Sequence, residues 1–282
     1  MSTEKPLVRL IQEHLEGDLQ ELPVFHSVAV KLQQLLAGRS FEIDDVIELI
    51  SEDQSLSGRL LKVANSSYYA GLTKIATIKD AIIRLGAQEI ANMAMMASQF
   101  EFYNSSNETL NRMMQSLWGH ALACAVGAKW LTRKAGYPGM AAEAFMGGLM
   151  HDIGSLALLK VLDDIIKSNQ TSVFFTDQLI NEIVDAMHAE VGFKLMQTWN
   201  FPDFYCDIAK SHHSEQYDQS NMLLVAVRLS NQACRKLGRS LKPADPSLTI
   251  FSAPEAHILG LKEIALAELE IIIEDADGIS VA

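Results

Sequence analysis

The chain has 282 residues, of which 49% are hydrophobic, so it can bury a large core in one domain or in two lobes. Its formal net charge of −12 excludes general binding to nucleic acid, because there is no excess of cations to displace the counterions of a phosphate backbone. With 12 methionines and only 7% aromatic residues, the composition favours helix packing over a β-sandwich.

The cysteines and the N-terminus indicate the compartment. Cys124, Cys206 and Cys234 are far apart and form no CxxC motif, which is typical of buried thiols in a reducing environment. The first residues contain no apolar signal region, and we expect no later run that approaches the ~18 apolar residues of a membrane span. The sequence therefore predicts a cytoplasmic protein that has no membrane partner.

Apolar residues recur with helical spacing through the first hundred residues. The segment TIKD, which begins at Thr77, resembles a capping box, and Gly86 stands where the end of a helix favours glycine. A further helix is expected at 87–99. We predict that these helices form an N-terminal lobe, residues 1–107, which ends in the polar joint 104–107.

Longer helical patterns follow this joint. The expected helices cover residues 109–134, 141–150, 155–168, 176–199, 203–213, 219–237 and 254–272. We assign them to a second lobe, residues 108–240, and to a C-terminal loop and helix, residues 241–282, packed on that lobe. The sequence shows no alternating strand pattern and no internal repeat, so the predicted fold class is all-α.

One segment is basic although the chain as a whole is acidic. It contains five cations and no acid, at Arg228, Arg235, Lys236, Arg239 and Lys242. We favour the interpretation that this segment is a solvated helix face followed by a loop. The alternative is a docking patch for an acidic partner, such as the acidic C-terminal part of this chain, with Glu263, Glu268, Glu270, Glu274, Asp275 and Asp277.

The segment GGLMHDIGSLALL places His151 and Asp152 side by side in an apolar run. Three further positions put histidines on apolar helix faces or at a helix end: His120, His188, and the pair His212 and His213. Each histidine alone fits a core residue or a residue favoured by the helix dipole. Five imidazoles and one carboxylate as a set suit zinc, iron, manganese or nickel, although spacing alone leaves their convergence open.

Several motifs of the chain resemble those of HDOD domains, which are the regulatory relatives of the bacterial HD and HD-GYP phosphohydrolases. The resemblance depends on the motifs EDQSLSGRLLKVANS, AIIRLG, GGLMHDIG, HAEVGFKLMQTWNFP and IAKSHH, and on LP near the start; it covers roughly residues 19–240. It implies a multi-helical fold of the HD-domain/phosphodiesterase type, with an N-terminal lobe packed on an HD-like lobe. It also implies a bacterial signalling function.

The same resemblance implies a metal site for one or two transition-metal ions. The implied ligands are His120, His151, Asp152, His188, His212 and His213. Two positions differ from the catalytic relatives: Ser155 replaces the lysine that follows HDIG, and Asn231 stands where a last aspartate is usual. Both changes remove charge that hydrolysis of a phosphodiester would use.

We therefore expect a non-catalytic regulatory module that binds a separate signalling protein or a small ligand. The alternative is a metal-dependent phosphohydrolase acting on a cyclic dinucleotide or a nucleotide. DNA binding through the two helices that meet at Gly86 is disfavoured, because the second helix has almost no cations to contact bases or phosphates. A homodimer is left open.

The N-terminal lobe offers a second candidate site. Arg59, Asn65 and Tyr68 mark a polar cluster, together with Lys62, Ser66, Ser67 and Tyr69. One interpretation is that these residues line a groove for a ligand or a partner protein. The other is that the short polar residues cap a helix end while the tyrosines pack with their hydroxyl groups outward.

Overall fold

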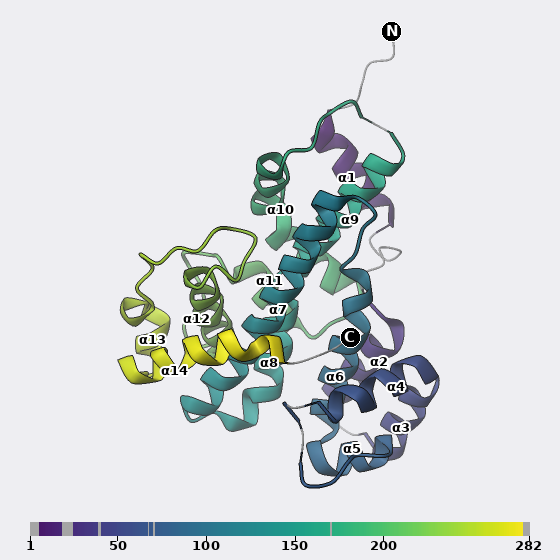
Figure 1. Ribbon diagram of the computed structural model, residues 1–282, viewed down its shortest axis with the longest axis vertical. Helices are drawn as coiled ribbons and strands as arrows, with labels where there is room; N and C mark the ends of the chain where they lie inside the picture. Colours follow the sequence, from purple (N-terminus) through teal and green to yellow (C-terminus); the bar gives the residue numbers. More distant parts are fainter. Residues whose placement is uncertain are drawn as a thin grey trace.

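The computed structural model describes residues 6–18, 25–38, 41–66, 68–69, 71–169 and 171–278. Every regular element in these ranges is a helix, which confirms the predicted all-α class (Figure 1). Ser67 and the leucine–proline pair of the family resemblance lie outside the described residues.

The first part of the chain forms an N-terminal lobe around one buried helix. Its helices are α2 (Ser27–Ala37), α3 (Ile43–Ser51), α4 (Gln54–Ala64), α5 (Ile78–Leu85) and α6 (Ala87–Gln99). Helices α2, α4 and α5 pack against α6, which is buried along 90–99. The side chains of α6 are therefore not available to contact DNA bases.

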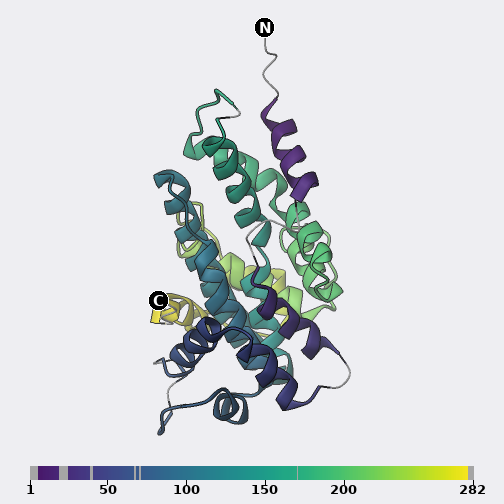
Figure 2. The same cartoon turned by 90° about the vertical axis from the view of Figure 1, so that its right-hand side faces the viewer.

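Helix α1 (Leu7–Asp18) lies apart from this lobe. It contacts α9, and both views place it far from α3 and α5 (Figures 1 and 2). Its buried side chains, Leu10, Ile11 and Leu15, follow the helical spacing of one apolar stripe. The first helix of the chain thus packs with elements of the second half.

Two caps in the N-terminal lobe explain where its helices begin. The Asp53 carboxylate accepts a hydrogen bond from the Leu56 amide at 2.9 Å and caps α4. The Thr77 hydroxyl accepts from the Asp80 amide at 3.0 Å, which confirms the predicted start of α5. Gly86 ends that helix with φ of +90°, a conformation that glycine adopts without strain.

The second half is built around the long central helix α7. The elements are α7 (Glu108–Lys134), α8 (Ala141–Met150), α9 (Ile153–Lys167), α10 (Asp177–Thr198), α11 (Asp203–Ser211) and α12 (Met222–Lys236), with short 3₁₀ turns at Phe100–Phe102 and Pro138–Met140. Helices α8, α9 and α12 all contact α7, and α9 and α11 pack against α10. Figure 1 shows α7 crossing the middle of the molecule.

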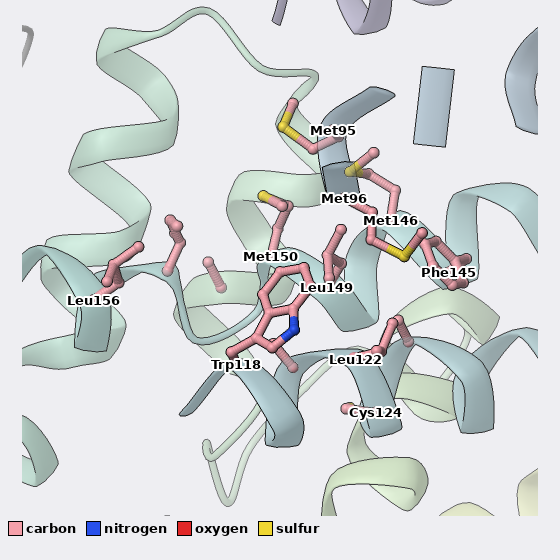
Figure 3. Close-up of a cluster of buried hydrophobic side chains, with 14 of the residues drawn as sticks. Met95, Met96, Trp118, Leu122, Cys124, Phe145, Met146, Leu149, Met150 and Leu156 are labelled. Atoms are coloured by element: carbon pink, nitrogen blue, oxygen red, sulfur yellow. The ribbon is translucent and has the colours of Figure 1, made fainter. Parts of the chain in front are cut away.

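Methionines fill the junction between the two lobes. Met95 and Met96 of α6 lie beside Met146 and Met150 of α8, above Trp118 of α7 (Figure 3). All five side chains are buried. Flexible thioethers suit this irregular contact between helices from different lobes, as the methionine-rich composition indicated.

The C-terminal part corrects one predicted element. The single helix expected at 254–272 is wrong, because the chain forms α13 (Pro254–Ile258) and α14 (Glu263–Glu274) instead. Gly260 adopts φ of +64° between them, a left-handed conformation that ends α13. After a short 3₁₀ turn at Ile250–Ser252, these two helices pack against α12.

This packing also corrects the interpretation of the basic segment as a solvated face. Lys236 pairs with Glu270 at 2.5 Å, and Arg239 donates to the Glu274 carbonyl oxygen at 3.1 Å. Arg228 is paired with Glu255 at 2.7 Å. The acidic C-terminal part of the chain therefore covers much of the basic segment, as the alternative interpretation proposed.

One stretch, Pro138–Lys167, is long and apolar enough to cross a membrane by composition alone, contrary to the expectation that no such run exists. It contains two helices, α8 and α9, with the His151–Asp152 turn between them. In the described structure 89% of its most apolar window is buried inside the fold. Core packing accounts for this apolar character.

Candidate metal centre

The structure brings together all six residues that the resemblance implied as ligands. His120 lies on α7, His188 on α10, and His212 and His213 at the end of α11, while His151 and Asp152 form the turn between α8 and α9. We refer to these six residues as the His/Asp centre. Their donor atoms form two sets, each within 4.8 Å: Asp152 with His188, His212 and His213, and Asp152 with His120 and His151.

Glycines beside the His-Asp turn allow the helices to approach closely enough for this convergence. A Cβ atom on Gly154 would lie 1.9 Å from the His188 carbonyl oxygen and 2.5 Å from the Gly192 amide. A Cβ atom on Gly148 would lie 2.6 Å from the Ala125 backbone of α7. Only glycine therefore lets α9 rest on α10 and α8 on α7, and the first contact places His188 beside the Asp152 turn.

Four of the five imidazole rings of the centre are fixed by hydrogen bonds to backbone carbonyl groups. Nδ1 donates to the Arg239 oxygen in His120 (2.6 Å), to Gly148 in His151 (2.7 Å), to Val184 in His188 (2.7 Å) and to Ala209 in His212 (2.8 Å). A ring that donates through Nδ1 carries its proton there, so Nε2 of the neutral ring presents a bare lone pair. This is the ring orientation that metal-binding histidines require.

The bare nitrogens face one another across Asp152. Nε2 of His120 lies 3.1 Å from Nε2 of His151, and Nε2 of His188 lies 3.3 Å from Nε2 of His212. Two lone pairs this close repel unless a cation lies between them. Two nitrogens held about 2.1 Å from one ion in perpendicular directions lie about 3 Å apart, so these spacings fit shared coordination.

Asp152 presents one carboxylate oxygen to each set. Oδ2 lies 3.4 Å from His120 Nε2, and Oδ1 lies 3.1 Å from His212 Nε2. Oδ1 is buried and has no hydrogen-bond partner among the described residues. A carboxylate placed in this way suits a bridge between two ions, so the donor set fits a metal group.

The pKa shifts of Asp152 and His120 also indicate that this site favours positive charge. Burial opposes ionisation of the Asp152 carboxyl, but His151 and the other imidazoles hold its pKa well below the usual range. Burial lowers the pKa of His120, yet Asp152 more than offsets this and the pKa is raised. Both shifts show that positive charge is favoured beside Asp152, whereas burial and the neighbouring His212 lower the pKa of His213 to about 2, so that ring stays neutral.

A small cavity of about 60 Å³ opens beside the centre. Ser155 and Asn231, the two positions that differ from the catalytic relatives, both line it. Sequence reasoning missed four polar residues of the same lining: Asp185, Arg235, Ser240 and Lys242. The cavity therefore contains cations, although the loss of the lysine at position 155 predicted a shortage of them.

Helical spacing could have located two of these missed residues. Arg235 follows Asn231 by four positions on α12, and Asp185 precedes His188 by three positions on α10. Residues with these spacings share one face of a helix. Ser240 and Lys242 lie in the loop after α12, where no periodicity indicates direction.

The structure does not gather the N-terminal candidates Arg59, Asn65 and Tyr68 into one pocket. Asn65 lines a depression beside Lys74, but neither Arg59 nor Tyr68 contributes to it. The Asn65 amide accepts from the Ile75 amide at 2.8 Å and donates to the Leu61 and Ile75 carbonyl oxygens. Arg59 forms an ion pair with Glu101.

Comparison with known proteins supports the resemblance. Residues 22–215 match the HDOD domain family. A relative from Treponema pallidum, an uncharacterized protein, is 22% identical over 225 residues, which are 78% of this chain and 43% of that protein. This chain therefore spans less than half the length of that relative.

Solved structures share the fold at low identity. An HDOD domain protein from Geobacter sulfurreducens is 21% identical, with a TM-score of 0.75 over 98% of both chains. A protein from Shewanella amazonensis, named as a candidate metal-dependent phosphohydrolase, is 21% identical with a TM-score of 0.68 over 97% of both chains. A candidate signal transduction protein from Marinobacter aquaeolei is 22% identical with a TM-score of 0.72, over 97% of this chain and 63% of that one.

Proposed function

The chain belongs to the HDOD family, and from this premise we propose that it is a non-catalytic regulatory module of bacterial signalling. In this proposal the module acts in the cytoplasm on a separate signalling protein. Its His/Asp centre holds one or two ions of iron, manganese, zinc or nickel, and so links helices α7 to α11.

The two donor sets assign the ligands of such ions. His120 and His151 would hold one ion, His188, His212 and His213 the other, and Asp152 would contribute to both. A bound ion supplies the positive charge that the facing imidazole nitrogens and the buried carboxylate demand. Because the ligands come from separate helices, binding also stabilises their packing.

The size of the cavity carries the non-catalytic part of the proposal. Pockets that enclose ligands of drug size measure about 300–1,000 Å³, whereas the cavity beside the centre measures about 60 Å³. A cyclic dinucleotide is too large to place its phosphodiester there without a rearrangement. The neutral Ser155 and Asn231 add to this, since neither supplies the charge found in catalytic relatives.

A metal-dependent phosphohydrolase is the second candidate function. It is favoured by the convergence of five imidazoles and one carboxylate in two donor sets that share Asp152. The cations Arg235 and Lys242 at the cavity would also attract a phosphate ester. The relative from Shewanella amazonensis that bears such a name shares the fold with this chain.

Elemental analysis followed by a turnover assay separates the two candidates. We expect protein purified without an affinity metal to contain stoichiometric transition metal, and Asp152→Ala to lose it, while the exposed control His257→Ala keeps it. With Mn²⁺ or Fe²⁺ added, we expect no hydrolysis of a cyclic dinucleotide. Turnover that disappears in His151→Ala and Asp152→Ala would establish the phosphohydrolase instead, and metal-free wild-type protein would remove the metal from the proposal.

A further inference from the structure

The outer wall of the cavity has a different chemistry from the His/Asp centre. It consists of Asn231 and Arg235, one turn apart on α12, and Lys242 in the loop that follows. We refer to these three residues as the α12 wall. None carries a negative charge, and two are cations.

Asn231 presents its side-chain amide to the cavity. Only 4% of the residue is exposed, it lines the cavity, and its side-chain amide makes no hydrogen bond to any residue in the described ranges. Its oxygen and nitrogen are not among the fully buried polar atoms that lack a partner, so the cavity gives solutes access to them. Its contact with the cavity offers it a partner from solution.

Arg235 is the exception among the cations of the basic segment. Arg228, Lys236 and Lys242 each pair with an acid. The half-buried guanidinium of Arg235 has no ion pair or side-chain hydrogen bond with any residue that the structure describes. Arg235 thus lines the cavity without an acidic partner, and a guanidinium carries the planar fork of donors that can bind an oxyanion in a bidentate manner.

Lys242 lies at the rim, where it can add to this wall. It pairs with Asp185 at 2.8 Å, and both side chains are 49% exposed. Exposed pairs contribute little to stability. Lys242 can therefore turn from Asp185 towards an anion in the cavity at little cost in stability.

We propose that the α12 wall binds a small oxyanion of the size of inorganic phosphate, which acts as a regulatory ligand beside the His/Asp centre. Asn231 donates from its amide, Arg235 through its fork, and Lys242 supplies long-range attraction. An aspartate at position 231 would repel the anion, so the asparagine turns a ligand position of the catalytic relatives into a donor. This inference rests on the proposed function, because residues of the His/Asp centre line the same cavity.

Calorimetric titration of the full chain with sodium phosphate tests the inference, on protein of measured metal content. We expect Arg235→Gln and Asn231→Asp each to weaken phosphate binding at least about tenfold, as loss of a charge-assisted hydrogen bond implies. Lys236→Gln is the matched control, since it removes the adjacent cation of α12, which pairs with Glu270 outside the cavity; its affinity should stay within about twofold of wild type. Circular dichroism verifies that each variant is folded.

Arg235→Lys keeps the test decisive if Arg235→Gln does not fold. It retains the charge and loses the fork, so binding should weaken by roughly three- to tenfold. Equal affinity of wild type, Arg235→Gln and Asn231→Asp would overturn the inference, as would the absence of any binding at about 10 mM phosphate.

Parallel titrations identify the source of the anion. Binding of phosphate and not of AMP assigns a free oxyanion, whereas binding of AMP that is equally sensitive to Arg235→Gln assigns the phosphate group of a larger ligand to the same wall. Failure of this inference is distinct from failure of the proposed function. If the protein contains metal but does not bind phosphate, the oxyanion inference is wrong and the regulatory proposal stands. If the protein binds phosphate and also hydrolyses cyclic dinucleotides, the α12 wall stands and the non-catalytic assignment is wrong.

Discussion

Two buried polar clusters in this protein differ in how completely their charged and hydrogen-bonding groups are paired with one another. Where α6 meets α7, the ammonium of Lys129, only 4% exposed, lies 2.5 Å from Glu89. The Tyr69 hydroxyl donates to the same carboxylate at 2.7 Å, and the ammonium lies 5.4 Å from the centre of the Phe145 ring. In the His/Asp centre, by contrast, lone pairs of several imidazoles face one another around a single carboxylate.

The difference separates a cluster whose members pair with one another from a cluster whose donor set fits a metal ion. The Lys129–Glu89 pair is neutral as a whole, and we call it closed because its charged groups pair with each other. Burial lowers the pKa of Lys129, and Glu89 opposes this shift. The His/Asp centre has more acceptors than donors, and a cation would balance them, as the proposed function assumes. Stability measurements can therefore distinguish the two clusters, because only the second should respond to metal.

The largest effect is expected from breaking the closed pair. Lys129→Met should lower the free energy of unfolding by about 3 kcal/mol, since it leaves the largely buried Glu89 charged with only the Tyr69 hydroxyl as a partner. The double variant Lys129→Met/Glu89→Gln should recover much of this loss. Chemical denaturation measures both, and a loss below about 1 kcal/mol for the single variant would show that the pair is not the closed cluster described above.

Metal removal should give the next largest effect. If free metal is present at about 100 times its dissociation constant, chelation removes about 2.7 kcal/mol of apparent stability. Thermal unfolding with and without a chelator measures this shift, and His257→Ala, outside the centre, should show the same shift as wild type. Identical unfolding temperatures in the presence and absence of chelator would contradict the comparison.

A smaller effect on stability is expected at Gly154, where the His/Asp centre depends on the close contact between α9 and α10. Gly154→Ala should destabilise the protein by roughly 1–3 kcal/mol, because the new methyl group meets the His188 carbonyl oxygen. It should also weaken metal retention, which separates it from a purely structural change. Gly58→Ala is the matched control: no atom lies within 4 Å of its added Cβ atom, so it should be neutral or slightly stabilising.

The smallest effect concerns a helix cap that belongs to neither cluster. Asp53→Ala should cost about 1 kcal/mol at neutral pH through loss of the α4 cap. The hydrogen bond from the Leu56 amide lowers the pKa of Asp53 below 3.8, with burial opposing and His26 assisting. Its ionic contribution is therefore complete above that value and is lost as the pH falls through the folded pKa. Denaturation at pH 7 and pH 3 should show a narrower gap between wild type and variant at the lower pH.

The sequence predicted the helices and the His/Asp centre better than the surroundings of that centre. Helical periodicity located the faces of His120 and His188, and the motif resemblance supplied the remaining residues. The break of the last helix at Gly260 was missed, because its apolar spacing continues across the glycine. The position of α1 against α9 is equally hidden, since one amphipathic stripe does not specify the helix against which it packs.

The lining of the cavity was predicted least well. Arg235 was treated as part of a solvated basic face, because charge alone does not show which cations the C-terminal helices cover. Lys236 and Glu270 are separated by 34 positions, and only the fold brings them together. Once that pairing is known, Arg235 stands out as a cation that lines the cavity and has no acidic partner among the described residues.

The placement of α12 relative to the matched family segment has a consequence for how such a protein can diversify. The match ends at residue 215, whereas α12 begins at Met222. Substitutions on one turn of α12 would therefore change the lining of the cavity without replacing any of the six residues of the His/Asp centre, none of which lies on α12.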